Sequence, residues 1–182
     1  CEVEGISDSM LQGDADYGEV LRKIGMKVDF SENGVQTENK GGLKGGAFDF
    51  NSISDTFLSL AAVSPLLDHP ISIRGISHTR KQETDRVSAM AIELNRLGQT
   101  VEESNDQLKV IQNLKRLKEL ARDGIEVETY HDHRFAMSFA ILGCHDLLGD
   151  GSAWLRIKNP NCCSKTFPNF FQKLDKLRKQ AQ

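Results

Sequence analysis

Hydrophobic positions along the chain form one arrangement that occurs twice. The segment Leu21-Arg-Lys-Ile-Gly-Met-Lys-Val28 returns as Leu94-Asn-Arg-Leu-Gly-Gln-Thr-Val101. Each copy ends a predicted helix at a glycine, the residue that adopts a left-handed conformation at least cost, and then enters a predicted strand. Before the second glycine, apolar residues at spacings of three and four form one helical face: Val87, Met90, Leu94 and Leu97.

A turn and a further strand follow each copy. The segments Ser31–Gly34 and Ser104–Asp106 are rich in residues that favour turns. Short apolar alternations flank them, at Val28, Phe30 and Val35 for the first turn and at Val101, Leu108 and Val110 for the second. The pattern therefore predicts one supersecondary unit used twice.

The second halves of the two units also match. An aspartate precedes an apolar stretch in both Asp55–Val63 and Asp132–Ala140, as expected of a capped helix start. Predicted strands follow at 71–74 and 153–157. A third helix is predicted from Thr166 to about Lys179, with Phe167, Phe170, Phe171 and Leu174 as core contacts. Trp154 is also expected in the core.

The chain therefore reads as a single α/β (α+β) domain, 1–182, with units at about 1–75, 76–158 and an incomplete third at 159–182. Units of this kind cannot bury their apolar faces alone and need neighbours. We expect helices inside a ring of short mixed sheets, with the missing strands supplied from elsewhere in the protein. The chain opens with Cys1 rather than Met, so we expect it to begin inside a longer gene product.

Composition narrows the class of protein. Hydrophobic residues make up 38% and charged residues 27%, which are globular values. The net charge of −3 gives no basic field, so nucleic acid is not an expected partner. No apolar run approaches a membrane span, and no secretory signal is evident. The cysteines have neither zinc nor disulfide-framework spacing, which favours reduced thiols in the cytoplasm: Cys1, Cys144, Cys162 and Cys163.

The densest chemistry lies in Arg80-Lys-Gln-Glu-Thr-Asp-Arg86, just before the long helix of the second unit. Thr84 or Asp85 is the expected N-cap, and Glu83 and Arg86 are three residues apart and point the same way. A helix start beside an arginine suits an anion. Taken alone, the segment fits an ordinary capped, charged helix start better than an anion site.

Three further segments place charged residues at predicted helix starts: Asp55 in 52–55, Arg134 in 130–134 and Lys165 in 163–168. Repeated units would bring these starts to one rim. Arg86, Arg134 and Lys165 would then surround an anion, with Asp55 and Glu83 as acid and base candidates. Two weaker signals are a phosphate loop at 41–46, which lacks the following GKS or GKT, and a metal set at 131–133, whose histidines are two residues apart.

Four segments together resemble the EPSP synthase family, in its order and spacing: Leu11-Gln-Gly-Asp14, 82–86, 130–134 and 164–168. The resemblance implies two domains, each of three βαβαββ units in an inside-out α/β barrel, with substrates between them. It implies that the first strands of the polypeptide complete the C-terminal domain. It also implies transfer of an enolpyruvyl group from phosphoenolpyruvate to shikimate 3-phosphate without a metal or organic cofactor.

The resemblance also implies roles for individual residues. Asp55 matches the proton acceptor and Glu83 the proton donor to the methylene carbon. Arg86, Arg134 and Lys165 match the cations that hold phosphoenolpyruvate. His78 lies where the family usually has an asparagine that touches shikimate phosphate, and Gln82 replaces the usual lysine. A neutral amide cannot neutralise an anion, so a non-catalytic phosphate-binding or structural domain is the alternative.

Overall fold

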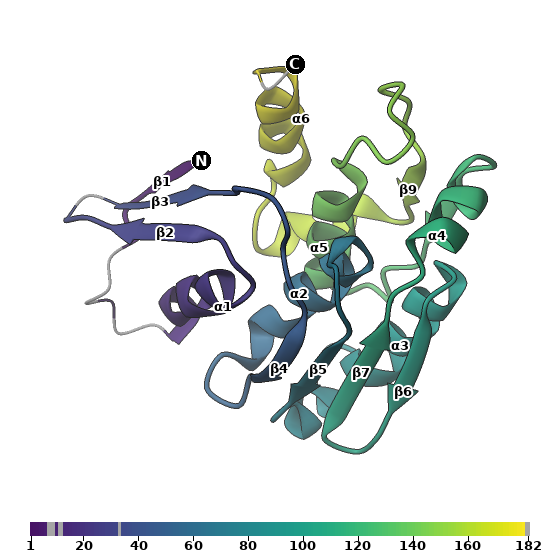
Figure 1. Ribbon diagram of the computed structural model, residues 1–182, viewed down its shortest axis with the longest axis horizontal. Helices are drawn as coiled ribbons and strands as arrows, with labels where there is room; N and C mark the ends of the chain where they lie inside the picture. The colour runs from purple at the N-terminus through teal and green to yellow at the C-terminus, as the bar shows by residue number, and fades with distance from the viewer. Residues whose placement is uncertain (7–9, 11–12, 33, 181–182) are drawn as a thin grey trace.

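The computed structural model describes residues 1–6, 10, 13–32 and 34–180 (Figure 1). Leu11 and Gln12 of the motif 11–14, and Asn33 of the first predicted turn, lie outside the described residues. Three separate sheets and six α-helices make up this part of the chain.

A four-stranded mixed sheet with strand order β4-β5-β7-β6 forms the centre of the chain. β4 and β5 are parallel, β7 is antiparallel to β5, and β6 is antiparallel to β7. In β5, the alternation Ile-Ser-Ile-Arg buries Ile71 and Ile73 and leaves the polar residues on the other face. The elements are β4 (Gly46–Asp49), η2 (Ser54–Thr56), α2 (Phe57–Val63), η3 (Ser64–Leu66), β5 (Ile71–Arg74), η4 (Ser77–Lys81), α3 (Arg86–Arg96), β6 (Thr100–Glu103) and β7 (Gln107–Ile111).

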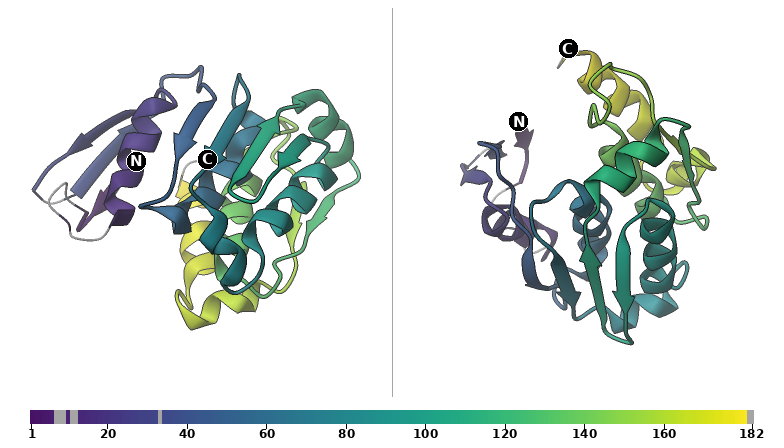
Figure 2. Two further views of the ribbon diagram at one scale, coloured as in Figure 1. Left: turned by 90° about the horizontal axis from the view of Figure 1, so that it is seen from below. Right: turned by 45° about the vertical axis from the view of Figure 1, so that its right-hand side comes forward.

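A small antiparallel sheet with order β1-β3-β2 precedes it and carries one helix. Figure 2 shows this purple and blue segment at one end of the molecule, beside β4. Its elements are β1 (Glu2–Glu4), η1 (Gly13–Asp16), α1 (Tyr17–Lys23), β2 (Lys27–Phe30) and β3 (Gly34–Glu38).

The last third contains a parallel pair, β8 and β9, with a helix between them. Among the described residues, neither strand has a second partner. The elements are α4 (Leu114–Ala121), β8 (Ile125–Val127), α5 (His133–Gly143), β9 (Leu155–Ile157), η5 (Pro160–Lys165) and α6 (Phe170–Gln180).

The core lies where α2 and α5 pack against each other. Phe57, Leu60, Phe135 and Phe139 are fully buried there, and each side chain contributes about 1.5–3 kcal/mol of hydrophobic stabilisation. Helix α2 connects β4 to β5, whereas α5 connects β8 to β9 of another sheet. Their contact therefore also fixes the N-terminal ends of the two helices relative to each other.

Several sequence predictions are confirmed. Strand β5 has the predicted bounds, and Trp154 is 1% exposed. Gly25 and Gly98 follow α1 and α3 with φ of +107° and +78°. At Gly98 a side chain would also approach Arg116 Cγ to 2.5 Å, so glycine is required there for two reasons.

Other predictions were wrong. The third helix begins at Phe170 rather than Thr166, because residues 160–165 form the 3-10 turn η5. The aromatic residues of this region are not core contacts: Phe167 is 37% exposed, and Phe170, Phe171 and Leu174 are only partly buried. Strand β9 begins at Leu155 rather than Ala153.

The start of the first unit's second helix also differs from its prediction. Asp55 lies within η2 and its side chain caps no helix amide, so it remains available for other partners. The four-stranded sheet extends across the predicted unit boundary between residues 75 and 76. Strands β4 and β5 precede this boundary in the chain, and β6 and β7 follow it. Strands β4 and β8 and helix α4 were not predicted.

No helix in the described residues has both the length and the apolar character needed to cross a bilayer. The four cysteines are all free thiols.

Candidate active site

The site lies where two pairs of parallel strands end. The loop after β4 carries Asp55, and the loop after β5 carries Gln82 and Glu83. The loop after β8 leads to Arg134 in the first turn of α5, and the loop after β9 carries Lys165. Binding sites of open α/β sheets occur at the carboxyl ends of parallel strands, because the connecting loops converge there.

Arg86 is the centre of the site although it is only 1% exposed. Its Nε donates to Asp132 Oδ2 at 2.7 Å, and its Nη2 donates to Glu83 Oε2 at 2.9 Å. Its Nη1 donates to Asp55 Oδ1 at 2.9 Å and also to the Gln82 side-chain oxygen. Four of the five N–H donors of the guanidinium are therefore used, and one on Nη2 remains.

Asp132 is fully buried and joins the two helix starts. Its Oδ1 caps α5 by accepting from the Arg134 amide at 2.8 Å, while its Oδ2 accepts from Arg86. The sequence predicted the cap but not the ion pair, which links residues 46 positions apart. A buried carboxylate with both oxygens bonded is satisfied only as long as both helix starts stay in place.

Asp55 bridges both arginines. Its Oδ2 accepts from Arg134 Nη2 at 2.7 Å, and its Oδ1 accepts from Arg86 and, at 3.2 Å, from Gln82 Nε2. Its side chain is 36% exposed and that of Arg134 is 29% exposed. Together with Glu83, which is also 36% exposed, this pair is therefore the part of the network that solvent, or a ligand, can reach.

The expected cluster of cations around an open anion site is not what the structure shows. Arg86 and Arg134 are instead paired with Asp55, Glu83 and Asp132, a network with a formal charge of −1. The structure brings together Asp55, Gln82, Glu83, Arg86 and Arg134. Within the described residues, no hydrogen bond or ion pair ties Lys165 to them, and His78 instead contacts Ser54 Oγ at 2.7 Å.

A family model described as EPSP synthase (3-phosphoshikimate 1-carboxyvinyltransferase) matches residues 1–174. The chain belongs to the EPSP synthase family. A 3-phosphoshikimate 1-carboxyvinyltransferase of Opitutus terrae is 48% identical over 171 residues, covering 94% of this chain and 35% of the relative. The one of Hamiltonella defensa is 39% identical over 172 residues, covering 94% and 37%.

Solved structures share the fold. An EPSP synthase of Acinetobacter baumannii matches with a TM-score of 0.73 and 18% identity, covering 96% of this chain and 41% of that one. The enolpyruvyl transferase NikO of Streptomyces tendae matches with a TM-score of 0.62 and 19% identity, covering 97% and 38%. The chain thus spans between 35% and 41% of these four proteins.

In this member of the EPSP synthase family, the sequence pattern did not predict the contacts that shape the loop before α5. Tyr130 and His131 are consecutive residues with φ of +54° and +58°, a strained conformation for residues with side chains. Tyr130 donates to the buried Glu93 at 2.8 Å, and this carboxylate also accepts from the Glu128 amide at 3.2 Å. Glu93 lies on α3, seven residues after Arg86, so one helix holds the loop at two points.

Next in the chain, His133 is 8% exposed, and its burial lowers the pKa of its imidazole. The thiol of Cys163 lies 3.7 Å from the His133 carbonyl oxygen, and burial raises the pKa of this thiol to about 12. A thiol with such a pKa stays protonated at neutral pH and is not a nucleophile.

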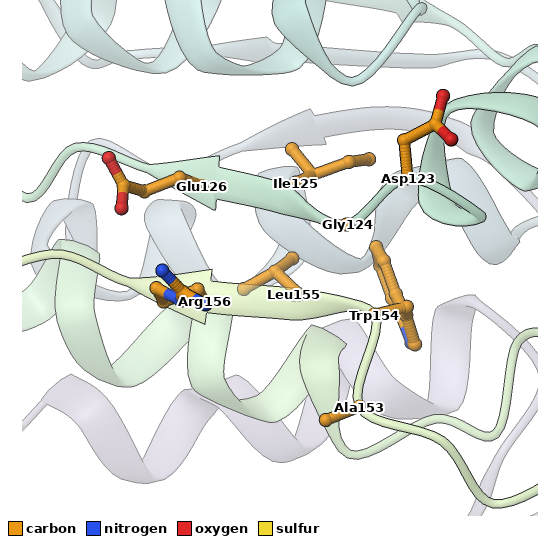
Figure 3. Close-up of a pocket in the computed structure, with 8 residues that line it drawn as sticks. All are labelled: Asp123, Gly124, Ile125, Glu126, Ala153, Trp154, Leu155 and Arg156. Atoms are coloured by element: carbon orange, nitrogen blue, oxygen red, sulfur yellow. The ribbon is translucent and has the colours of Figure 1, made fainter.

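One cavity of the described surface, of about 410 Å³, lies over β8 and β9, between residues 123–126 and 153–156 (Figure 3). Its lining includes residues just before the N-terminal ends of the two strands, such as Gly124 and Trp154. Arg134 and Lys165 instead come after the C-terminal ends of these strands. The network around Arg86 contributes no residue to it.

Proposed function

We propose that the chain is the C-terminal part of a two-domain EPSP synthase. The whole enzyme would transfer the enolpyruvyl group of phosphoenolpyruvate to the 5-hydroxyl of shikimate 3-phosphate and release phosphate, in the cytoplasm. One observation carries this proposal: Asp55, Glu83, Arg86 and Arg134 arrive from three separate loops and meet in one hydrogen-bonded network. An ordinary charged helix start would account for Glu83 and Arg86 alone.

The proposed architecture is an inside-out barrel of βαβαββ units with an incomplete last unit. Residues 46–111 contain strand, helix, strand, helix and two strands in one sheet, which is one complete unit. Residues 125–180 repeat its first four elements as β8, α5, β9 and α6. In the complete unit the edge of β5 pairs with antiparallel β7, so the edge of β9 would receive an antiparallel strand from the remaining part of the enzyme.

The proposed roles follow the exposure of each group. Asp55 accepts the proton of the attacking 5-hydroxyl, and Glu83 donates a proton to the methylene carbon. The resulting tetrahedral intermediate then loses phosphate and a proton, which restores the double bond. Arg134 and Lys165 would bind the anionic groups directly, and His78 and Gln82 would contact the phosphorylated sugar acid. Arg86 has one free donor and mainly holds the two carboxylates in place.

The charge balance supports one alternative. Because the arginines are already paired with carboxylates and Gln82 is neutral, the site could belong to a non-catalytic domain that binds a phosphorylated ligand weakly. Such a domain would still need the convergence of loops but not the proton-transfer groups.

Phosphate release separates the two functions. The 182-residue chain and the full-length protein that contains it are each assayed with phosphoenolpyruvate and shikimate 3-phosphate. We expect turnover only from the full-length protein, because a single wall leaves the anions hydrated and the two substrates unaligned. Binding without turnover in the full-length protein would establish the non-catalytic alternative. Equal turnover from the 182-residue chain would refute a site shared between domains.

A further inference from the structure

The turn between β6 and β7, residues 104–106, is bonded to the segment that enters the site. Asp106 accepts from the backbone amides of Gly75 and Ser77 at 3.1 and 2.8 Å. These amide bonds, that of Ser77 above all, hold the pKa of Asp106 below its ordinary value. The carboxylate therefore fixes the start of η4, where the chain leaves β5.

Arg80 fixes the other end of η4. Its Nε donates to the Asn105 carbonyl oxygen at 2.9 Å, and its Nη2 donates to the Ser104 carbonyl oxygen at 2.6 Å and to Glu103 Oε1 at 2.8 Å. Its Nη1 donates to both oxygens of Asp85 at 3.0 and 2.9 Å. One guanidinium thus joins three segments: η4, the β6–β7 turn and the N-cap of α3.

Further hydrogen bonds hold the N-terminal end of α3. The Asp85 side chain caps α3 by accepting from the Ser88 amide at 3.0 Å, and Ser88 Oγ donates to Glu103 at 2.6 Å. Arg80 and Asp85 anchor the two ends of the segment that carries Gln82 and Glu83. Each of these two residues, and also Arg86, lies within two positions of one anchor. This segment has no regular secondary structure of its own, so it depends on the anchors for its position.

Arg80 differs from Arg86 in the number of N–H donors that remain without an acceptor. Each N–H donor of Arg80 has an acceptor within the protein, the second donor of Nη1 meeting Ser88 Oγ at 3.5 Å, and its side chain is 17% exposed. It has no donor for a substrate anion. A role in the reaction must therefore be exerted through the residues that it holds.

We propose that Arg80 is a positioning residue of this active site: it clamps η4 to the β6–β7 turn and to α3, and thereby places Glu83 and Gln82. This inference rests on the proposed function and extends it to a residue that does not touch substrate. Small displacements of a reacting group reduce turnover steeply, by about a hundredfold for about 1 Å.

The test compares Arg80→Met with Arg80→Lys in the full-length enzyme. Methionine keeps an unbranched apolar stem and removes all donors, whereas lysine keeps the charge but cannot span three segments. Arg22→Met is the matched control, because Arg22 also bonds a carboxylate and a backbone carbonyl but lies beside the N-terminal sheet. We expect kcat to fall about ten- to hundredfold in Arg80→Met, to be partly restored in Arg80→Lys and to stay unchanged in Arg22→Met. KM should change less than about threefold.

Amide hydrogen exchange provides a readout that does not depend on turnover. Exchange of the amides in 75–88 should accelerate in Arg80→Met, while exchange in β5 and the body of α3 stays slow. Unchanged kcat with unchanged exchange would overturn the clamp. A loss of kcat that follows only a lowered melting temperature, with uniform acceleration across the domain, would also overturn it. If the unmodified enzyme shows no turnover but exchange in 75–88 still rises selectively, the proposed function fails and the clamp stands.

Discussion

Arg134 donates a 2.7 Å hydrogen bond from Nη2 to Oδ2 of Asp55, 79 positions earlier in the chain. The contact joins the loop after β4 to the start of α5, and both of its charged groups are partly exposed. An incoming anion that takes this Nη2 donor of Arg134 must replace Asp55. In the proposed reaction, the same exchange would release Asp55 Oδ2 to accept a proton, so this pair would couple ligand binding to activation of the base.

Asp55→Asn should separate these two effects. We expect turnover of the full-length enzyme to fall by about 10² to 10⁴, since the amide cannot accept the hydroxyl proton. Binding of phosphoenolpyruvate, measured by calorimetry, should become tighter because the internal carboxylate no longer competes for Arg134. Asp49→Asn, at the end of the same strand and paired with Arg74, is the control and should change neither quantity. Weaker binding in Asp55→Asn would contradict the exchange.

Glu83→Gln should lower kcat by about 10² to 10⁴ while KM changes little, because proton transfer is the proposed task of this carboxylate. Glu119→Gln is a matched control, since Glu119 and Arg116 form an i,i+3 ion pair like that of Glu83 and Arg86. Initial rates over a range of both substrates give the two constants. An effect on KM alone would make Glu83 a binding residue.

Gln82→Lys should strengthen anion binding. The substitution changes the formal charge of the network from −1 to 0, and a half-solvated charge is worth about 0.5–1 kcal/mol, or roughly two- to fivefold in Kd. Titration with shikimate 3-phosphate at low and high salt measures the gain and its screening. Gln36→Lys adds the same charge on the N-terminal sheet and should have no effect. No gain at low salt would show that Gln82 does not face the anion.

Asp132→Ala should be the most destabilising of these changes. It leaves Arg86 buried with an unpaired Nε and removes the cap of α5, at a cost of about 3–5 kcal/mol for the buried pair and about 1 kcal/mol for the cap. Urea unfolding of the full-length enzyme measures the loss. Asp175→Asn, which removes an exposed partner of Lys179, should stay within about 0.5 kcal/mol. If Asp132→Ala matched this control, the buried pair would be unimportant for stability.

His133 should make the protein less stable in mild acid. Burial lowers its pKa, so between the ordinary value near 6.5 and the lower folded value the unfolded chain binds more protons. The stabilisation is complete above the ordinary pKa and is lost as the pH falls through that window, by at most about 1.4 kcal/mol per pH unit for one proton. Urea midpoints at pH 7.5 and 5.5 should differ more for the unmodified protein than for His133→Gln. The exposed His69→Gln is the control, and an equal pH dependence in all three proteins would contradict the assignment.

Local chemistry determined what could be predicted from the sequence. The alternation at 71–74 and the stripe from Val87 to Leu97 depend on neighbours within one element, and both occur as predicted. The caps Asp85 and Asp132 bond amides two or three residues away, within reach of sequence patterns. The helix at 114–121 was not predicted, although its signals are equally local: Asn113 caps it, and Leu117 and Ala121 form its buried face.

The environment of each charged group could not be predicted in this way. A helix start beside an arginine predicts an anion site, but Arg86 and Arg134 meet carboxylates from segments 31 to 79 positions away. Only the packing of α2 against α5 brings those segments together. The prediction that the aromatic residues near α6 are core contacts was wrong for a different reason. The apolar pattern indicates a face that another segment should cover, and the described residues do not cover it.

The open edge of β9 has a consequence for the chain studied on its own. Unpaired backbone donors and acceptors on an edge strand accept any extended segment, including one from another molecule. Leu177 of nearby α6, which is 61% exposed, and Phe167, three residues before this helix, add an apolar surface. We therefore expect isolated copies to self-associate as their concentration rises, and to remain monomeric once the remaining part of the enzyme occupies this edge.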